Sequence, residues 1–285
     1  MRNQDPTNTE SSNIPTIPVS NDHIPGTERG EGDQQGEPTF QILVVHRTCI
    51  IMDMIKHFKD ESVMKCELLF KVINERGKEE IAQGSGVNKE VFCLFWKEFS
   101  NSMTIGETER VPFVRHDHFV KEWEAVGRIL VKSYSSVSYF PLFLSKAFMC
   151  HCLFGTEIPD DIVMDSFMKY LSPEEEELIK DYLGKSKFPE DNDELFDFLE
   201  RFNCRSLVNE SNLRKVLLEI ANQELVQKPH VMLATWQPMV QELKCYPQFQ
   251  DCSAVQSFYD TIKPTTKKVL EKLSADPRSE GEVMH

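Results

Sequence analysis

The stretch between residues 123 and 155 constrains the fold most, because it holds two apolar helical patterns separated by Pro141. In the first pattern large apolar residues recur at helical spacing: Trp123, Val126, Leu130 and Tyr134. Within it, Gly127 leaves room for a close neighbour. In the second pattern Ser145 can cap a helix that stops at Gly155. Five large apolar side chains buried on such a helix contribute roughly 10 kcal/mol before chain entropy is counted. We therefore expect a buried helical pair here.

The rest of the chain is also mostly helical in its apolar spacing. One exception is Glu67–Ile73, a short apolar run closed by turn residues, which is typical of a buried strand. The spacing predicts further helices over Arg47–Asp60, Val91–Phe99 after the turn Gly84–Gly86, Ser172–Gly184, Asp193–Phe202, Asn209 or Ser211 to Gln227, Val231–Leu243 and Phe258–Leu273. The predicted fold is mainly α with a few short β-strands, an α+β chain.

Composition excludes several classes of protein. The chain has 285 residues, 40% of them hydrophobic, so it can bury a sizeable core as one large or two small domains. A formal charge of -14 without a basic run argues against a nucleic-acid partner. No apolar run approaches the roughly 20 residues of a membrane span, so we expect no membrane partner. The eight cysteines mostly lie in apolar segments, which favours reduced thiols and a cytoplasmic or nuclear location.

The two ends of the chain differ from its middle. Residues 1–38 contain no aromatic side chain and are rich in polar, proline and acidic residues, so we expect a disordered acidic tail. Residues 39–273 form the predicted folded lobe. Residues 274–285 are predicted to be a flexible C-terminus.

Three landmarks of the lobe occur in a family order. The first is Gly86–Phe92 (GVNKEVF) after a strand and a glycine-rich turn. The second is Gly127–Leu130 (GRIL), continued by the segments Phe140–Leu142 and Leu153–Gly155. The third is Leu207–Asn212 (LVNESN) before a long helix. Together they resemble the amino-terminal lobe of the HECT domain of ubiquitin-protein ligases, over residues 44–243.

The resemblance implies half of a two-lobed enzyme. The family's amino-terminal lobe docks a ubiquitin-conjugating enzyme, and its carboxy-terminal lobe carries a cysteine that accepts ubiquitin as a thioester and passes it to a substrate lysine. After Leu243 the chain matches neither the rest of that lobe nor the family's terminal Thr-Cys motif, and the turn Gly84–Gly86 is weaker than the usual Asp-x-Gly-Gly. The implied partners are a ubiquitin-conjugating enzyme, ubiquitin and protein substrates. No cofactor is expected, because the chain lacks a phosphate-binding glycine-lysine loop.

Two hypotheses remain at this stage. In the first, the chain is a ligase truncated before its catalytic cysteine, so it is inactive alone although its family transfers ubiquitin. In the second, it is a non-catalytic binding protein that docks a conjugating enzyme or regulates another ligase. The sequence does not separate them.

Cys49 is the one cysteine in a setting that partly resembles the family's catalytic site. His46-Arg47-Thr48-Cys49 places Thr before Cys near a His, but a helical apolar stripe continues after it and the position is at the wrong end of the domain. We expect Cys49 to be inert and no catalytic residue to be present. The triplets His116–His118 and Cys150–Cys152 have spacings that do not suit tetrahedral zinc, so no metal site is expected.

The candidate docking region lies at about residues 160–206, where the family's conjugating-enzyme-binding subdomain would fall. Aromatic and leucine side chains on short helices could form a surface for a partner loop. The candidate partner-binding residues are Phe167, Tyr170, Leu195, Phe196 and Leu199. The alternative is that Phe196 and Leu199 pack internally, against Leu178 and Tyr182.

Overall fold

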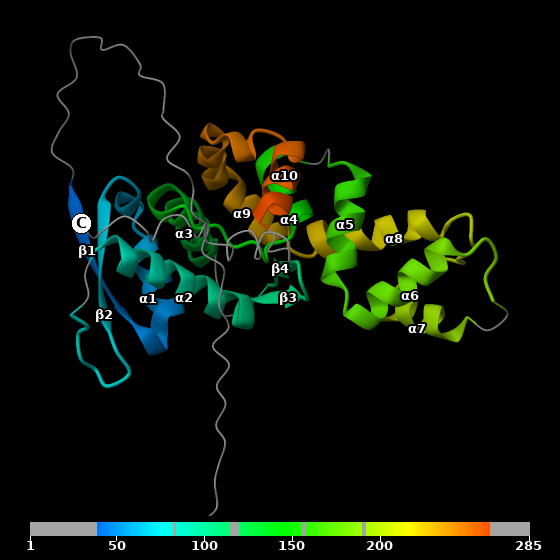
Figure 1. Ribbon diagram of the computed structural model, residues 1–285, viewed down its shortest axis with the longest axis horizontal. Coiled ribbons are helices and arrows are strands. Elements are labelled where there is room, and N and C mark those ends of the chain that lie inside the picture. The colour runs from blue at the N-terminus through cyan, green and yellow to red at the C-terminus, as the bar shows by residue number, and fades with distance from the viewer. Residues whose placement is uncertain (1–38, 82–83, 115–119, 156–157, 190–191, 263–285) are drawn as a thin grey trace, which may run out of the picture. The chain divides into compact units, whose positions relative to one another are not determined.

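The computed structural model describes residues 39–262, except residues 82–83, 115–119, 156–157 and 190–191 (Figure 1). The described residues up to Tyr259 belong to one compact unit. The predicted tail at residues 1–38, the predicted flexible segment at residues 274–285 and the triplet at residues 116–118 lie outside the described residues.

The described part of the chain is mainly helical with a few short strands, as the sequence predicted. The strands are β1 (Phe40–His46), β2 (Glu67–Ile73), β3 (Thr104–Gly106) and β4 (Arg110–Pro112). The α-helices are α1 (Ile50–Phe58), α2 (Ser85–Met103), α3 (Val120–Val137), α4 (Lys146–Phe154), α5 (Asp160–Tyr170), α6 (Pro173–Gly184), α7 (Asp193–Arg201), α8 (Leu213–Asn222), α9 (His230–Val240) and α10 (Cys252–Ile262). None of the described helices is long and apolar enough to cross a membrane.

Most of the predicted elements are present, with shifted ends. The strand predicted over Glu67–Ile73 is β2, with the predicted bounds. The helix predicted to run to Gln227 leaves α-helical geometry earlier: α8 ends at Asn222, and a π-helical turn, η3 (Gln223–Gln227), follows it. The last predicted helix begins at Cys252 instead of Phe258. Strand β1 and helix α5 were not predicted as separate elements.

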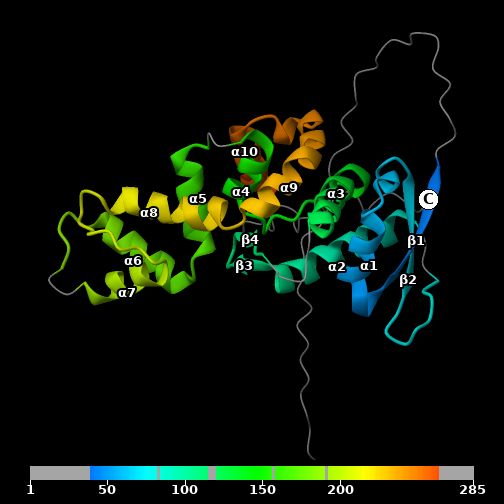
Figure 2. The same ribbon diagram turned by 180° about the vertical axis from the view of Figure 1, so that it is seen from behind.

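The strands β1 and β2 form a two-stranded parallel sheet, in which Ile42 is aligned with Leu69. A parallel pair needs a crossover connection, and α1 supplies it. Figure 1 and Figure 2 show α1 and α2 beside the two strands from opposite sides. The residues that face these helices are buried: Leu43, Val45, Leu68, Phe70 and Val72. The sheet therefore contributes one of its faces to the core.

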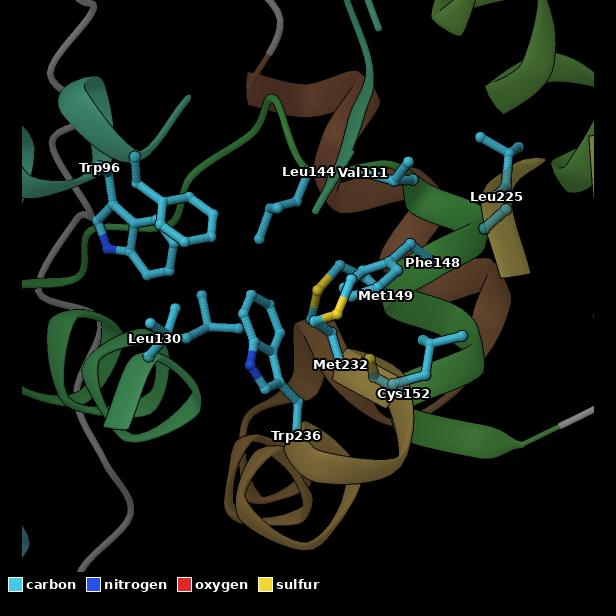
Figure 3. Packing of buried hydrophobic residues seen from close by; sticks show 14 of the residues in the cluster. Trp96, Val111, Leu130, Leu144, Phe148, Met149, Cys152, Leu225, Met232 and Trp236 are labelled. Atoms are coloured by element: carbon cyan, nitrogen blue, oxygen red, sulfur yellow. The ribbon is translucent and has the colours of Figure 1, made fainter. Parts of the chain in front are cut away.

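The centre of the core contains large aromatic residues of α2, α4 and α9: Figure 3 shows Trp96, Phe148 and Trp236 among aliphatic and sulfur-containing side chains. The fully buried rings of Trp236 on α9 and Phe148 on α4 meet edge to face, with centroids 5.5 Å apart. On α3, a Cβ atom at Gly127 would lie 3.2 Å from Cδ1 of Trp236, so this position needs the absence of a side chain. The predicted close neighbour of Gly127 is therefore α9.

Two basic side chains of α3 bind backbone carbonyl groups in the stretch from the end of α1 to the start of β2. The guanidinium of Arg128 donates to the carbonyl oxygen of Phe58 at 3.1 Å. The ammonium of Lys132 donates to the carbonyl oxygens of Met64 and Cys66, at 3.1 and 2.7 Å. Both side chains are buried, so these bonds satisfy carbonyl groups that the end of a helix and the following turn leave without partners.

Candidate functional site

The candidate docking region contains a helical hairpin, α6 and α7, that begins with a capping box. The hydroxyl of Ser172 accepts a hydrogen bond from the amide of Glu175 at 3.3 Å, and the Glu175 carboxylate accepts one from the amide of Ser172 at 3.0 Å. The same carboxylate forms an ion pair with Arg201 at the end of α7. The predicted helix start is confirmed, and its Glu also ties the two helices together.

The five candidate partner-binding residues do not share one surface. Phe167 on α5 and Leu195 and Leu199 on α7 are buried, with no more than 3% of each residue exposed. Tyr170 is half-buried at the end of α5. Phe196 alone is well exposed, at 50%. Helix α7 is amphipathic, and Leu195 and Leu199 lie on its buried side. With Phe167, they belong to the core and offer no exposed area to a partner in this structure.

The solvent face of α7 combines one aromatic ring with carboxylates. Phe196, Asp197, Glu200 and Asp193 are all exposed, and their spacing places them on one stripe of the helix. We call these four residues the α7 face. An exposed aromatic residue surrounded by negative charge suits a partner with an apolar socket and basic neighbours. The aromatic residue was expected from the sequence but the carboxylates were not, although helical spacing within DELFDFLER indicates them.

Helix α5, which precedes the hairpin in the chain, is held at its C-terminal end by the turn between β3 and β4. The amide of Glu107 donates to the carbonyl oxygen of Tyr170 at 3.2 Å. The amides of Thr108 and Glu109 both donate to the carbonyl oxygen of Lys169, at 3.0 Å each. Three backbone donors thus cap the last turn of α5, which otherwise would have unpaired carbonyl groups. This cap sets where the hairpin begins.

The start of α4 also contacts α5 and the β3–β4 turn. We call the place where these three elements meet the junction. A carboxylate oxygen of Glu109 accepts a hydrogen bond from the amide of Lys146 at 2.9 Å, and the hydroxyl of Ser166 on α5 accepts one from the amide of Ala147 at 3.0 Å. Glu109 is almost fully buried. A buried carboxylate is favourable at this place because the first amides of a helix carry partial positive charge.

Four charged groups close the junction. The Glu109 carboxylate lies 3.8 Å from the ammonium of Lys146 and 3.7 Å from that of Lys169, and both ammonium groups also form ion pairs with Asp165. Burial raises the pKa of Glu109, while the amide and ammonium of Lys146 act in the opposite direction. Burial also opposes ionisation of Asp165, but hydrogen bonds from the two lysines hold its pKa below the usual range. All four groups are engaged with one another, so this cluster joins α4, α5 and the β3–β4 turn.

Cys49 is the N-cap residue of α1, but its thiol makes no capping hydrogen bond to that helix. It is exposed at the end of the turn η1 (Arg47–Cys49), and its sulfur lies 3.8 Å from the hydroxyl of Thr48. The imidazole of His46 is turned to Asp53 instead, whose carboxylate it contacts at 2.8 Å. A cysteine is activated by a nearby base, a positive charge or a helix N-terminus. Among the described residues, the Cys49 sulfur contacts the hydroxyl of Thr48, which is neither a base nor a positive charge.

Burial suppresses the reactivity of two further thiols, both on α4. All eight cysteines are free. Burial raises the pKa of Cys150 and Cys152 on α4, so both stay protonated and unreactive at neutral pH. Within the described ranges there is no group of three or more His, Cys, Asp or Glu side chains that could hold a metal ion.

Comparisons with known proteins place the chain in no family. No protein-family model matches it, and no curated protein matches it either.

Proposed function

We propose that this chain docks a ubiquitin-conjugating enzyme as part of a HECT-type ubiquitin-protein ligase. The observation that carries the proposal is the α7 face, where the exposed ring of Phe196 stands among carboxylates at the position of the family's docking subdomain. A docking surface of this kind contributes affinity through the buried aromatic ring and orientation through the charges around it.

The order of the elements supports the same proposal. A strand, β2, is followed by Gly84, whose φ of 109° suits glycine, and then by α2, which contains the Gly86–Phe92 motif. The later motif Leu207–Asn212 precedes α8. In it, the Asn209 side chain accepts hydrogen bonds from the amides of Ser211 and Asn212, a local turn that starts the helix. The motifs that resemble the family thus have structural roles as well.

In this proposal the thioester step belongs to a second lobe, outside these 285 residues. Ubiquitin and protein substrates are then partners of the complete ligase, and the chain itself receives the charged conjugating enzyme. The free state of all eight cysteines suits a reducing compartment, so we place the protein in the cytoplasm or the nucleus.

Docking can be tested by titrating the 285-residue chain with a panel of ubiquitin-conjugating enzymes and measuring the dissociation constant by calorimetry. We expect Phe196→Ala to raise the dissociation constant about 10-fold or more, because exposed aromatic residues are common hot spots. Phe40→Ala is the matched control, since Phe40 is exposed to a similar extent (58%) on β1 and should not affect docking. Equal binding by both variants, or no binding by any conjugating enzyme, would refute the proposal.

The absence of thioester chemistry is tested separately. After incubation with activating enzyme, conjugating enzyme and ubiquitin, we expect no adduct on the chain that a thiol reagent removes. Such an adduct, abolished by Cys49→Ala, would instead make this chain a ligase by itself. A chain that binds the conjugating enzyme without an adduct acts either as the docking half of a ligase or as a non-catalytic binding protein. Joining a HECT carboxy-terminal lobe to it separates the two, because only a docking half would then transfer ubiquitin.

A further inference from the structure

The outer face of the β1–β2 sheet is apolar and exposed. Phe40, Ile42 and Val44 alternate along β1 and are 58, 57 and 42% exposed. Leu69, the partner of Ile42 in the register, is 39% exposed on β2. Alternate residues of a strand point to one side, so these four side chains lie together on the face opposite the buried one. We call them the outer sheet face.

The edge of β1 is partly closed by α1. The carboxylate of Asp53 accepts a hydrogen bond from the amide of His46 at 2.7 Å. The imidazole of His57 donates to the carbonyl oxygen of Val44 at 2.8 Å. These bonds occupy backbone groups on the C-terminal half of the edge that does not pair with β2, and an additional strand would need them.

The edge of β2 is closed as well. The side-chain amide of Asn88 on α2 donates to the carbonyl oxygen of Leu68 at 2.7 Å and accepts from the amide of Phe70 at 3.4 Å. The amide of Glu80 donates to the carbonyl oxygen of Val72 at 2.9 Å. Since both edges are engaged, the outer sheet face is the part of this sheet best suited to bind a partner.

The charges on this face have a pattern that suits a second copy of the same sheet. Glu67 and Lys71 flank Leu69 on β2, and both lie on the outer side. In the register Glu67 is beside Phe40, and Lys71 is beside Val44. Glu67 and Lys71 are therefore two residues before and two residues after Leu69, at equal distances along the strand from the centre of the face.

We propose that the outer sheet face is a self-association surface that packs against the same face of a second copy of this chain. The twofold axis lies midway between the two sheets, runs perpendicular to the strands and passes over Ile42. It therefore reverses the strand direction in the partner. It then brings Glu67 opposite the partner subunit's Lys71, and Lys71 opposite the partner subunit's Glu67. Phe40 meets the partner's Val44, and the apolar centre packs on itself, as required for an isologous interface. The ion pair of Lys71 with Glu79, at 3.2 Å on the surface, does not prevent this.

The predicted dimer is weak. Stable interfaces bury about 800 Å² on each partner, and four partly exposed side chains with two charged neighbours supply less than that. We therefore expect an equilibrium between monomer and dimer in the micromolar to millimolar range, instead of a permanent dimer.

The test is sedimentation velocity of the full 285-residue chain, from low micromolar to several hundred micromolar concentration. We expect the weight-average sedimentation coefficient to rise with concentration. Glu67→Lys places like charges opposite each other and should weaken dimerisation about 10-fold, and Lys71→Glu should do the same. The double variant, with both charges exchanged, should restore dimerisation. Glu75→Lys, a charge reversal at the exposed turn after β2, is the control and should have no effect.

Two further results check the position of the axis. Ile42→Lys introduces a buried charge at the centre and should abolish dimerisation, while circular dichroism shows an unchanged fold because the side chain points to solvent in the monomer. A chain that stays monomeric at every concentration would overturn the proposal. So would a dimer that tolerates Ile42→Lys, or one in which the double charge exchange fails to rescue the single ones.

Discussion

Gly106 is the position where one added methyl group should do most harm, because it lies in the turn that caps α5. Its φ is 116°, a backbone conformation that residues with a Cβ atom rarely adopt. A Cβ atom there would lie 2.4 Å from the carbonyl oxygen of Glu109 and 2.7 Å from Cδ2 of Tyr170. The first of these atoms belongs to the backbone, so the turn itself has to move. We therefore choose Gly106→Ala as the perturbation.

The cost follows from two contributions. Backbone strain at this φ is about 1 to 3 kcal/mol. A displaced turn also weakens the three backbone hydrogen bonds from residues 107–109 to the carbonyl groups of Lys169 and Tyr170, at about 0.5 to 1.5 kcal/mol each. We expect the free energy of unfolding to fall by roughly 2.5 kcal/mol or more, and by about 7.5 kcal/mol if all three bonds are lost, a large part of the 5 to 15 kcal/mol typical of a folded protein.

The variant Gly77→Ala distinguishes the cost of backbone strain at positive φ from the cost of a collision between the added Cβ atom and its neighbours. Gly77 also has a positive φ, 71°, but a Cβ atom there would meet nothing within 4 Å. Its cost should be the strain alone, about 1 kcal/mol. Both variants are compared with the parent chain by urea unfolding, followed by far-ultraviolet circular dichroism. Hydrogen exchange at the amides of residues 107–109 provides a second measurement, since these are the donors of the cap.

Two outcomes for these variants would contradict the reasoning. If Gly106→Ala and Gly77→Ala lower the free energy of unfolding equally, the close approach of the turn to α5 does not matter for stability. If Gly106→Ala is destabilising but the amides of residues 107–109 keep their protection, the loss does not arise from the cap. Either result would refute the claim that the β3–β4 turn stabilises the C-terminal end of α5.

Three further predictions address the hairpin and the core. Leu199→Ala should lower the free energy of unfolding by about 2 to 5 kcal/mol and Phe196→Ala by less than about 1, since only the first side chain is buried; similar losses in urea unfolding would contradict this. Ser172→Ala should cost about 1 kcal/mol through loss of the capping box, whereas the exposed Ser186→Ala should cost almost nothing in the same assay. Burial raises the pKa of Tyr134 from 10.0 to about 12, so the folded state keeps this proton longer than the unfolded state. The free energy of unfolding should therefore fall as pH rises from about 10 towards about 12, and Tyr134→Phe should make that fall smaller; an unchanged pH dependence would contradict it.

The fold was predictable where one segment contains its own signal. The helix at Ser172 has a cap, a proline and a glutamate within four residues, and β2 is a continuous apolar run between turns. Strand β1 was missed although its residues alternate, because its outward positions Phe40, Ile42 and Val44 are apolar and hide the alternation. The π-helical turn η3 could not be predicted, because no local pattern distinguishes it from a continued α-helix.

In the candidate site, too, the sequence predicted some features and packing decided the others. The sequence indicated that residues 160–206 carry more large apolar side chains than short helices usually hide, and it pointed to Phe196 among them. Which of these side chains remain exposed was decided by packing: Leu195 and Leu199 turn into the core, and Phe196 turns to solvent. Hydrophobicity alone does not distinguish a core residue from a docking residue, because both functions use the same side chains.

The sequence by itself determined the mainly helical class and several helix starts, such as those at Ser145, Ser172 and Asp193, since these depend on neighbours within a few residues. The tertiary structure decided which distant segments of the chain contact one another. It brought Glu109 to the start of α4, joined α5 to the β3–β4 turn, and left one face of the β1–β2 sheet uncovered. Such contacts join residues far apart in the chain, and their energies depend on distance and burial, which only the folded chain defines.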